Sequence, residues 1–277
     1  MTSATPLLTL GFFSALLIAW MASADGRRIW RRYRIQQQPF PAEWRDILRR
    51  RVPYLRLLPP DLRLKLQKLI QVFVAEKPFI GCDGLQISDE IRVTIAAHAC
   101  LLILNRPAGG YPELREILVY PGAFWVDREQ AAPGGLVHRE RRVLSGESSS
   151  RGYVVLSWRD VVADAAIPDD GINVAIHEFA HQIDQEKGYA NGAPTRIGQG
   201  RIQQWSVVMQ EEFQRLQAQA RGGETSILNH YGATAPEEFF AVVSEVFFEQ
   251  APVMRERYPR LFAELRDFYR IDPTAWS

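Results

Sequence analysis

The sequence predicts a mixed α+β fold, in which a small β-sheet lies beside a short helix that carries two histidines and a glutamate. Apolar residues recur at helical spacing towards both ends of the chain, in residues 55–76 and 236–247. Between them, residues 114–158 contain four runs rich in β-branched and aromatic residues. The string His177-Glu178-Phe179-Ala180-His181 then follows an apolar-rich run, which favours a helix packed against that sheet.

Composition is that of an ordinary globular protein with a proper core. The chain has 277 residues, of which 47% are hydrophobic and 23% are charged. A formal net charge of +1 gives no global field that would attract nucleic acid. Its two cysteines, Cys82 and Cys100, form no CxxC pair, so the sequence predicts neither a disulfide framework nor a thiolate metal cluster, and a reducing compartment is expected.

Residues 7–22 form a nearly uninterrupted apolar run, and no charged residue occurs in residues 2–24. A helix of about 20 residues at about 1.5 Å per residue roughly spans the hydrocarbon core of a bilayer. The run is followed by a group of arginines with interleaved aromatics, which is typical of a cytoplasmic membrane boundary: Arg27, Arg28, Trp30, Arg31, Arg32, Tyr33 and Arg34. We expect a transmembrane anchor in residues 1–24, a basic juxtamembrane linker in residues 25–42 and a folded domain in residues 43–277. The chain would then be a single-pass protein of the inner membrane with this domain in the cytoplasm.

A cleaved signal peptide is the competing interpretation, because Ala22-Ser23-Ala24 resembles a cleavage site of small residues. Two features favour the anchor. The segment before the apolar run has no Lys or Arg, and the arginine cluster follows the run instead of preceding it.

The first helix of the folded domain is predicted over residues 55–76, with Pro59-Pro60-Asp61 at the start of its main part and Pro78 just past its end. Ser88-Asp89-Glu90 opens a second helix with an apolar face. His98 lies in this second helix, and a lone histidine in such a setting indicates a structural role. A long helix with polar faces is predicted for residues 201–221.

Four strands are expected in residues 117–120, 124–126, 137–144 and 153–156. Alternation is weak in residues 137–144, so this strand is expected at an edge of the sheet. His138 is a possible site residue, but a surface position on this strand is favoured. The polar residues 146–152 are interpreted as a connection between two strands.

On a helix, residues four apart lie on the same face, so His177 and His181 can present two imidazoles to one metal ion. Glu178 lies about 100° round the helix from His177, which suits a general base that does not itself bind the metal. Asp169 and Asp170 are N-cap candidates for this helix, and Gly188 is a candidate for its end.

A catalytic zinc takes three protein ligands, so a third must come from elsewhere in the chain. The metzincin position for a third histidine is Lys187, which excludes that class. Asp184 shares the face of His177 and His181, so it could bind the metal directly, but a role in supporting the ligands or at the helix end is favoured.

A further helix starts after Thr234, which forms a capping box with Glu237 and is followed by Pro236. Glu238 and Glu245 are seven residues apart on one face of this apolar helix. A buried carboxylate needs a counter-charge, which a zinc ion would supply. Spacing alone does not choose between the two glutamates.

These stretches resemble the Mlc titration factor A family of zinc metallopeptidases, whose catalytic core is related to that of anthrax lethal factor. The resemblance rests on residues 177–184, His-Glu-Phe-Ala-His-Gln-Ile-Asp, and on residues 231–241, Tyr-Gly-Ala-Thr-Ala-Pro-Glu-Glu-Phe-Phe-Ala. It implies a zincin-like core that holds one Zn²⁺ per chain. The implied site consists of His177, His181 and Glu238 as zinc ligands, Glu178 as the base, and Tyr231 as the donor to the oxyanion.

The resulting expectation is a zinc-dependent peptidase acting on a peptide or protein, in which an edge strand beside the metal can pair with an extended substrate. Two alternatives stay open. The chain could be a zinc-containing binding module that sequesters a regulatory protein such as a transcriptional repressor, or a zinc hydrolase of non-peptide amides.

Overall fold

The computed structural model describes residue 23 and residues 26–106, 110–132, 136–144, 146–149, 151–187, 190–194 and 200–276. The chain divides into two compact units, Met1–Phe40 and Pro41–Ser277. In the first unit, residues 26–37 are helical. The predicted membrane segment, residues 7–22, lies outside the described residues, and among those that are described no helix is long and apolar enough to cross a membrane. The inner-membrane placement therefore stays a prediction.

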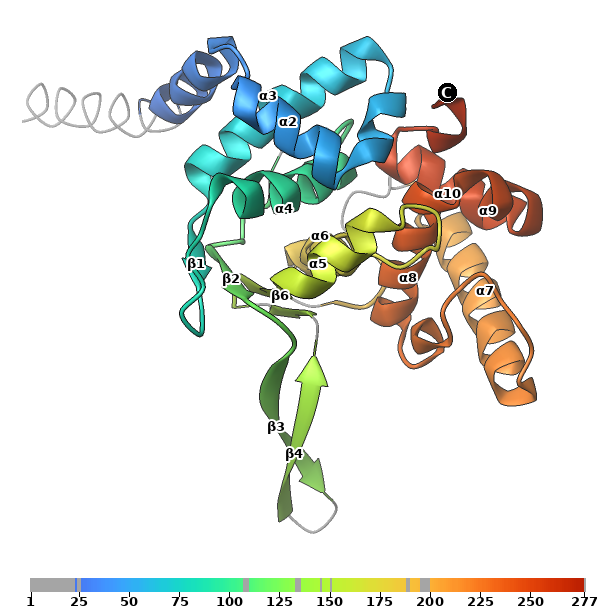
Figure 1. The fold of residues 1–277 in the computed structure, drawn as a ribbon. Helices are drawn as coiled ribbons and strands as arrows, with labels where there is room; N and C mark the ends of the chain where they lie inside the picture. Colours follow the sequence, from blue (N-terminus) through green and yellow to red (C-terminus); the bar gives the residue numbers. More distant parts are fainter. Residues whose placement is uncertain are drawn as a thin grey trace, which may run out of the picture. The chain divides into compact units, whose positions relative to one another are not determined.

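The second unit is mixed α+β, as the sequence predicts (Figure 1). Its α-helices are α2 (Ala42–Arg51), α3 (Pro60–Glu76), α4 (Asp89–Leu102), α5 (Trp158–Ala166), α6 (Val174–Asp184), α7 (Ile202–Gly222), α8 (Pro236–Glu249), α9 (Ala251–Arg257) and α10 (Pro259–Tyr269). Short 3₁₀ helices are η1 (Pro53–Leu57), η2 (Gln185–Lys187), η3 (His230–Ala233) and η4 (Pro273–Ala275). The strands are β1 (Phe79–Gly81), β2 (Glu116–Tyr120), β3 (Phe124–Ala132), β4 (Leu136–Leu144), β5 (Gly146–Ser149) and β6 (Tyr153–Ser157).

Four of these strands form one sheet in the order β1-β2-β6-β5. Strands β1, β2 and β6 are parallel, with Ile117 opposite Val154, whereas β5 runs antiparallel to β6, with Gly146 opposite Leu156. Interpreting residues 146–152 as a mere connection was therefore wrong, because residues 146–149 are the edge strand of this sheet. The expected edge strand in residues 137–144 instead pairs with β3 in a separate two-stranded ribbon.

Helix α6 is the centre of the second unit. It contacts strands β5 and β6 of the sheet and helices α4 and α8. Helix α4 in turn packs against α2 and α3 (Figure 1). Its apolar residues Ile176, Phe179 and Ile183 are fully buried. Phe179 meets Phe73 of α3 and Tyr111, with ring centroids 5.8 and 5.1 Å away. The sequence around the two histidines therefore lies in the hydrophobic core, held from several sides.

Two helix starts lie where the sequence predicts them, but the predicted cap of α8 does not form. Ser88 caps α4 by accepting a hydrogen bond from the Ile91 amide, and Pro236 begins α8, both as predicted. The predicted capping box was wrong: Ala235 is the N-cap of α8 and provides no side-chain hydrogen bond. Thr234 belongs to the preceding 3₁₀ turn, since its hydroxyl donates to the carbonyl of Tyr231.

His98 has the structural role that the sequence indicates. Its ring is fully buried in α4, and Nδ1–H donates to the carbonyl of Thr94 over 3.0 Å. Burial lowers the pKa of His98 to about 4, although the hydrogen bond to Thr94 opposes this shift.

We expect the stability of the folded chain to fall as the pH drops from about 6.5 to about 4, because in this window only the unfolded state protonates His98. The loss attributable to His98 is about 3 kcal/mol at pH 4. Urea unfolding of the wild type and of His98→Asn, which keeps a donor near Thr94 but does not titrate, measures it. The same pH slope in both proteins would contradict this assignment.

Candidate metal centre

Helix α6 begins at Val174 because Asn173 caps it: the Asn173 side chain accepts a hydrogen bond from the Ile176 amide over 3.0 Å. The predicted caps Asp169 and Asp170 were wrong. Asp170 instead accepts from the Ile172 amide in a turn before the helix, which leaves Ile172 47% exposed outside α6. The helix ends at Asp184, and the predicted stop Gly188 lies outside the described residues.

His177 and His181 face Glu238 across the contact between α6 and α8. The Nε2 atoms of the two histidines are 3.2 Å apart, and Glu238 Oε2 lies 3.0 Å from that of His177 and 3.3 Å from that of His181. Each of the three residues offers one atom that can bind a metal, and these three atoms lie within 4.8 Å of one another. This is a group that could hold one metal ion, and imidazole nitrogen with carboxylate oxygen suits zinc.

The hydrogen-bonding partners of His177 support the fit of a cation. Glu245 Oε1 accepts from Nδ1–H of His177 over 2.8 Å, so in the neutral ring Nε2 carries a lone pair. That lone pair points at a carboxylate oxygen and at a second imidazole nitrogen. Acceptor atoms this close repel one another unless a proton or a metal cation lies among them.

The charges of the group agree with that argument. Burial disfavours a charged His177, but the Glu245 and Glu238 carboxylates outweigh burial and raise the pKa of His177 well above its usual value. Burial likewise disfavours a charged Glu238, yet hydrogen bonds from both histidines hold the pKa of Glu238 far below its usual range. A positive charge between these side chains is thus strongly favoured.

Glu245 lies behind His177, on the side away from Glu238. Besides accepting from His177, it accepts from the Asn173 amide over 2.6 Å, and Glu249 accepts from the Asn173 side chain over 2.8 Å. Both glutamates of the face predicted on α8 therefore contact α6, at different positions along it. The structure brings Glu238 to the two Nε2 atoms, while Glu245 orients the His177 ring.

Glu178 lies next to the group but outside it. Its side chain is buried, and Oε2 has no hydrogen-bonding partner among the described residues. Burial raises the pKa of Glu178 to about 7, and nearby Glu238 and Glu245 add to the shift while His177 and His181 oppose it. A carboxyl with this pKa can both accept and release a proton near neutral pH.

The edge strand β5 fits closely against Glu178. A Cβ atom at Gly146 would lie 2.5 Å from Glu178 Oε1, so only glycine leaves room for the carboxylate there. Further along the strand, Ser148 accepts a hydrogen bond from the Gln182 side chain over 2.7 Å, which fixes β5 to α6. Neither contact could be predicted from the sequence, because residues 146–149 show no apolar alternation that would mark them as a strand.

Tyr231 lies in η3, beside the His177 ring. The two ring centroids are 6.0 Å apart, and the tyrosine is 51% exposed. Asn229 holds the turn by accepting from the Tyr231 amide over 2.9 Å. The residue is thus placed where it can meet a molecule bound at the histidines.

The remaining acidic candidate on α6 does not join the group. Asp184 accepts from the amides of Asn191 and Gly192 over 2.8 and 2.7 Å, so it supports the loop after α6, in line with the helix-end role expected for it. The side chain of His138 lies outside the described residues.

Comparison with known proteins identifies the family. Residues 27–270 match the model of the family described as glucose-regulated metallo-peptidase M90. A protein of Synechocystis sp. is 40% identical over 245 residues, which cover 88% of this chain and 89% of that protein. Mlc titration factor A of Pectobacterium atrosepticum is 34% identical over 227 residues, which cover 81% of this chain and 84% of that protein. Mlc titration factor A of Klebsiella pneumoniae is 32% identical over 225 residues, with 80% and 84% covered. The chain therefore belongs to the glucose-regulated metallo-peptidase M90 family, together with the Mlc titration factors A.

Proposed function

We propose that the protein is a zinc-dependent peptidase that hydrolyses peptide bonds, with His177, His181 and Glu238 as the zinc ligands. The single observation that supports this most strongly is the convergence of three acceptor atoms from these residues beside the buried carboxyl of Glu178, whose Oε2 has no hydrogen-bonding partner among the described residues. A closed structural site would take a fourth protein ligand and would not need a buried base. Membership of a metallo-peptidase family agrees with a hydrolytic metal site.

Each residue of the site has a separate role in the proposed hydrolysis. Zinc held at this site would acidify a water molecule and polarise the scissile carbonyl. Glu178, with its pKa near 7, accepts a proton from the attacking water and passes it to the leaving amine. Tyr231 donates a hydrogen bond to the carbonyl oxygen as negative charge develops on it. Glu245 keeps the His177 ring in one orientation and one tautomer.

The substrate is proposed to bind along β5. This strand lies at the end of the sheet order, with β6 on one side, and Gly146 places its backbone against Glu178. An extended peptide can pair with such an edge through main-chain hydrogen bonds. This arrangement would set the scissile bond beside the base.

A binding role is the second candidate, and the names of the relatives support it. Mlc titration factors A are named for an effect on Mlc, so this chain could act by docking a regulatory protein. Such a role does not require Glu178 or Tyr231. Their placement beside the histidines is why we favour catalysis.

Replacing the base tests the proposal. Glu178→Gln keeps the size of the side chain but cannot accept the proton, so we expect peptide hydrolysis to fall by about 10²–10⁴-fold. Its zinc content should stay near one ion per chain, since Glu178 is not a proposed ligand. His177→Ala should lose both zinc and hydrolysis. The measurements are cleavage of a peptide library, analysed by mass spectrometry, and metal content by atomic emission.

Retained hydrolysis in Glu178→Gln would contradict the role of Glu178 as the general base. A wild type that binds zinc but cleaves no peptide in the library would favour the binding role.

Gly146→Ala tests the contact between β5 and the base. The added methyl group would overlap Glu178 Oε1, so the carboxylate must shift, and we expect kcat to fall by roughly tenfold or more. Zinc content should not change. Gly200→Ala is the matched control, because a Cβ there meets no atom of the described residues within 4 Å. Equal kcat values for the two variants would show that β5 does not position Glu178.

A further inference from the structure

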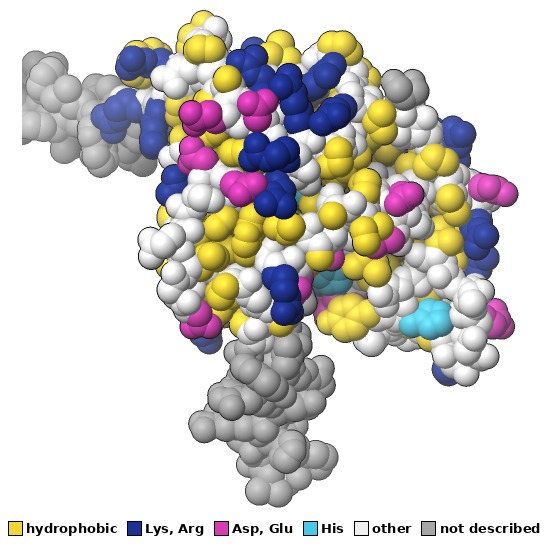
Figure 2. Space-filling model, viewed as in Figure 1, with side chains coloured by type: hydrophobic (Ala, Val, Ile, Leu, Met, Phe, Trp, Pro, Cys, Tyr) yellow, Lys and Arg dark blue, Asp and Glu magenta, His cyan; other side chains and the backbone are white. Residues whose placement is uncertain are grey.

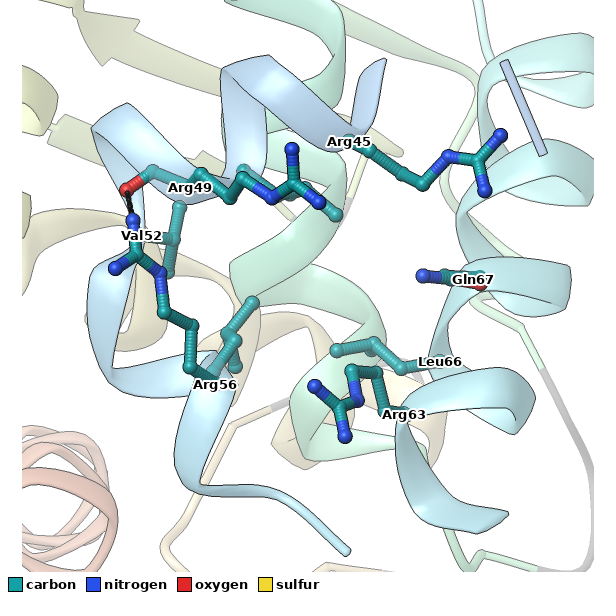
Figure 3. A pocket seen from close by; sticks show the side chains of 9 residues that line it. Arg45, Arg49, Val52, Arg56, Arg63, Leu66 and Gln67 are labelled. Carbon is teal, nitrogen blue, oxygen red and sulfur yellow. Dashed lines mark hydrogen bonds between the residues drawn. The ribbon is translucent and has the colours of Figure 1, made fainter. Parts of the chain in front are cut away.

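A second concave site lies in the same unit, between α2, η1 and α3. Its volume is about 240 Å³, and Figure 3 shows arginine side chains from all three elements around it. The lining residues are Arg45, Leu48, Arg49, Val52, Leu55, Arg56, Arg63, Leu66 and Gln67. None of the residues that line the pocket belongs to the histidine group or to α6 and α8, so this pocket is separate from that group.

The pocket has an apolar floor and a basic rim. Val52, Leu55 and Leu66 form the floor and are 0, 5 and 2% exposed. The arginines are exposed and lie above them. Figure 2 shows the same imbalance from outside, since dark blue side chains gather on the face over α2 and α3.

Among the described residues that line the pocket, none is a carboxylate that would neutralise these arginines. Arg49 pairs with Asp46 over 2.8 Å. Arg56 donates to the backbone carbonyl of Arg49, and this hydrogen bond positions the Arg56 guanidinium without neutralising its charge. Arg45 and Arg63 have no acidic partner within the described part of the chain. The pocket thus carries several positive charges that the residues around it leave uncompensated.

Helix stability does not explain all of these arginines. Arg49 lies in the last turn of α2, where a positive charge is favourable. Arg63, however, lies near the start of α3, the end at which a helix favours anions and disfavours cations. Its placement in one pocket with Arg45 and Arg56 therefore adds to repulsion unless an anion binds among them.

We propose that this pocket binds a phosphate ester that carries an apolar substituent. Guanidinium groups match phosphate oxygens in bidentate geometry, and the floor of Val52, Leu55 and Leu66 accommodates hydrocarbon. The volume lies below the roughly 300–1,000 Å³ of pockets for drug-sized ligands, so it fits a small ligand or one headgroup with the start of its chain. The source is either a soluble phosphate monoester or an anionic phospholipid, and both present an anionic phosphate joined to a hydrocarbon chain.

The first arm of the test uses soluble probes with the full chain. Hexyl phosphate and inorganic phosphate are titrated by calorimetry at constant ionic strength. Hexyl phosphate should bind more tightly, because only it covers the apolar floor. In the double variant Arg45→Gln/Arg63→Gln its affinity should fall by about tenfold or more.

The second arm uses sedimentation with vesicles of phosphatidylcholine alone, or of phosphatidylcholine and phosphatidylglycerol in equal parts. Arg221→Gln/Arg257→Gln is the control, since it removes the same charge from exposed positions that do not line the pocket. Both double variants keep residues 1–40, so any binding by that segment is common to them. Circular dichroism melting checks that each variant is folded.

A loss of hexyl phosphate binding confined to the Arg45 and Arg63 variant would establish a site for soluble phosphate esters. A loss confined to that variant and seen only with phosphatidylglycerol vesicles would identify the ligand as a lipid headgroup. If the two double variants behave alike in both arms, binding is non-specific and the proposal is overturned. Tighter binding of inorganic phosphate than of hexyl phosphate would also overturn it, because the apolar floor would then have no role.

Discussion

The imidazole of His177, held between two carboxylates of α8, is the interaction on which the rest of the site depends. Glu245 accepts a hydrogen bond from Nδ1–H of His177, and Glu238 Oε2 lies 3.0 Å from Nε2 of the same ring. This contact joins α6, which packs on the sheet, to α8, which belongs to the C-terminal helices. Burying carboxylates is costly unless they are paired, so both glutamates tie the position of α8 to that of α6. The candidate metal group is therefore also a structural link within the unit.

Asn173 extends this link to the start of α6. Its side chain caps the helix, its amide donates to Glu245, and its side-chain nitrogen donates to Glu249. Burial raises the pKa of Glu249 to about 9, so near neutral pH this carboxyl is largely protonated and adds no negative charge to the cluster. The first turn of α6 is thereby fixed before His177, which constrains the imidazole at its backbone as well as at its ring.

The sequence predicts the parts of this arrangement that depend on neighbours along the chain. Helical spacing places His177 and His181 on one face, and Pro236 marks the start of α8. Spacing cannot distinguish Glu238 from Glu245, because residues seven apart share a face and the choice depends on how far α8 is shifted along α6. That shift is a property of packing. The family resemblance pointed to Glu238, which the structure brings to the histidines, whereas the role of Glu245 emerged only from the structure.

The edge strand and the caps were missed for different reasons. Strand β5 is short and its residues are small or polar, so residues 146–149 carry no alternation of apolar side chains and are interpreted as a connection from sequence alone. Several residues before α6 are good caps by type, and Gly171, with φ of +78°, carries the chain through a further turn before Asn173 takes that role. The capping box at Thr234 does not form, because the Thr234 hydroxyl donates to the carbonyl of Tyr231 in η3. At the helix starts a competing local hydrogen bond decides, whereas β5 is defined by its pairing with β6.

The most direct test of the central claim is to locate the metal. Crystals of the zinc-loaded protein should give one strong anomalous difference peak at the zinc absorption edge, within bonding distance of His177 Nε2, His181 Nε2 and a carboxylate oxygen of Glu238, at about 2.0–2.2 Å. Glu245 should stay hydrogen-bonded to Nδ1 of His177. A peak bound by Glu245 in place of Glu238, or by other residues, would contradict the account.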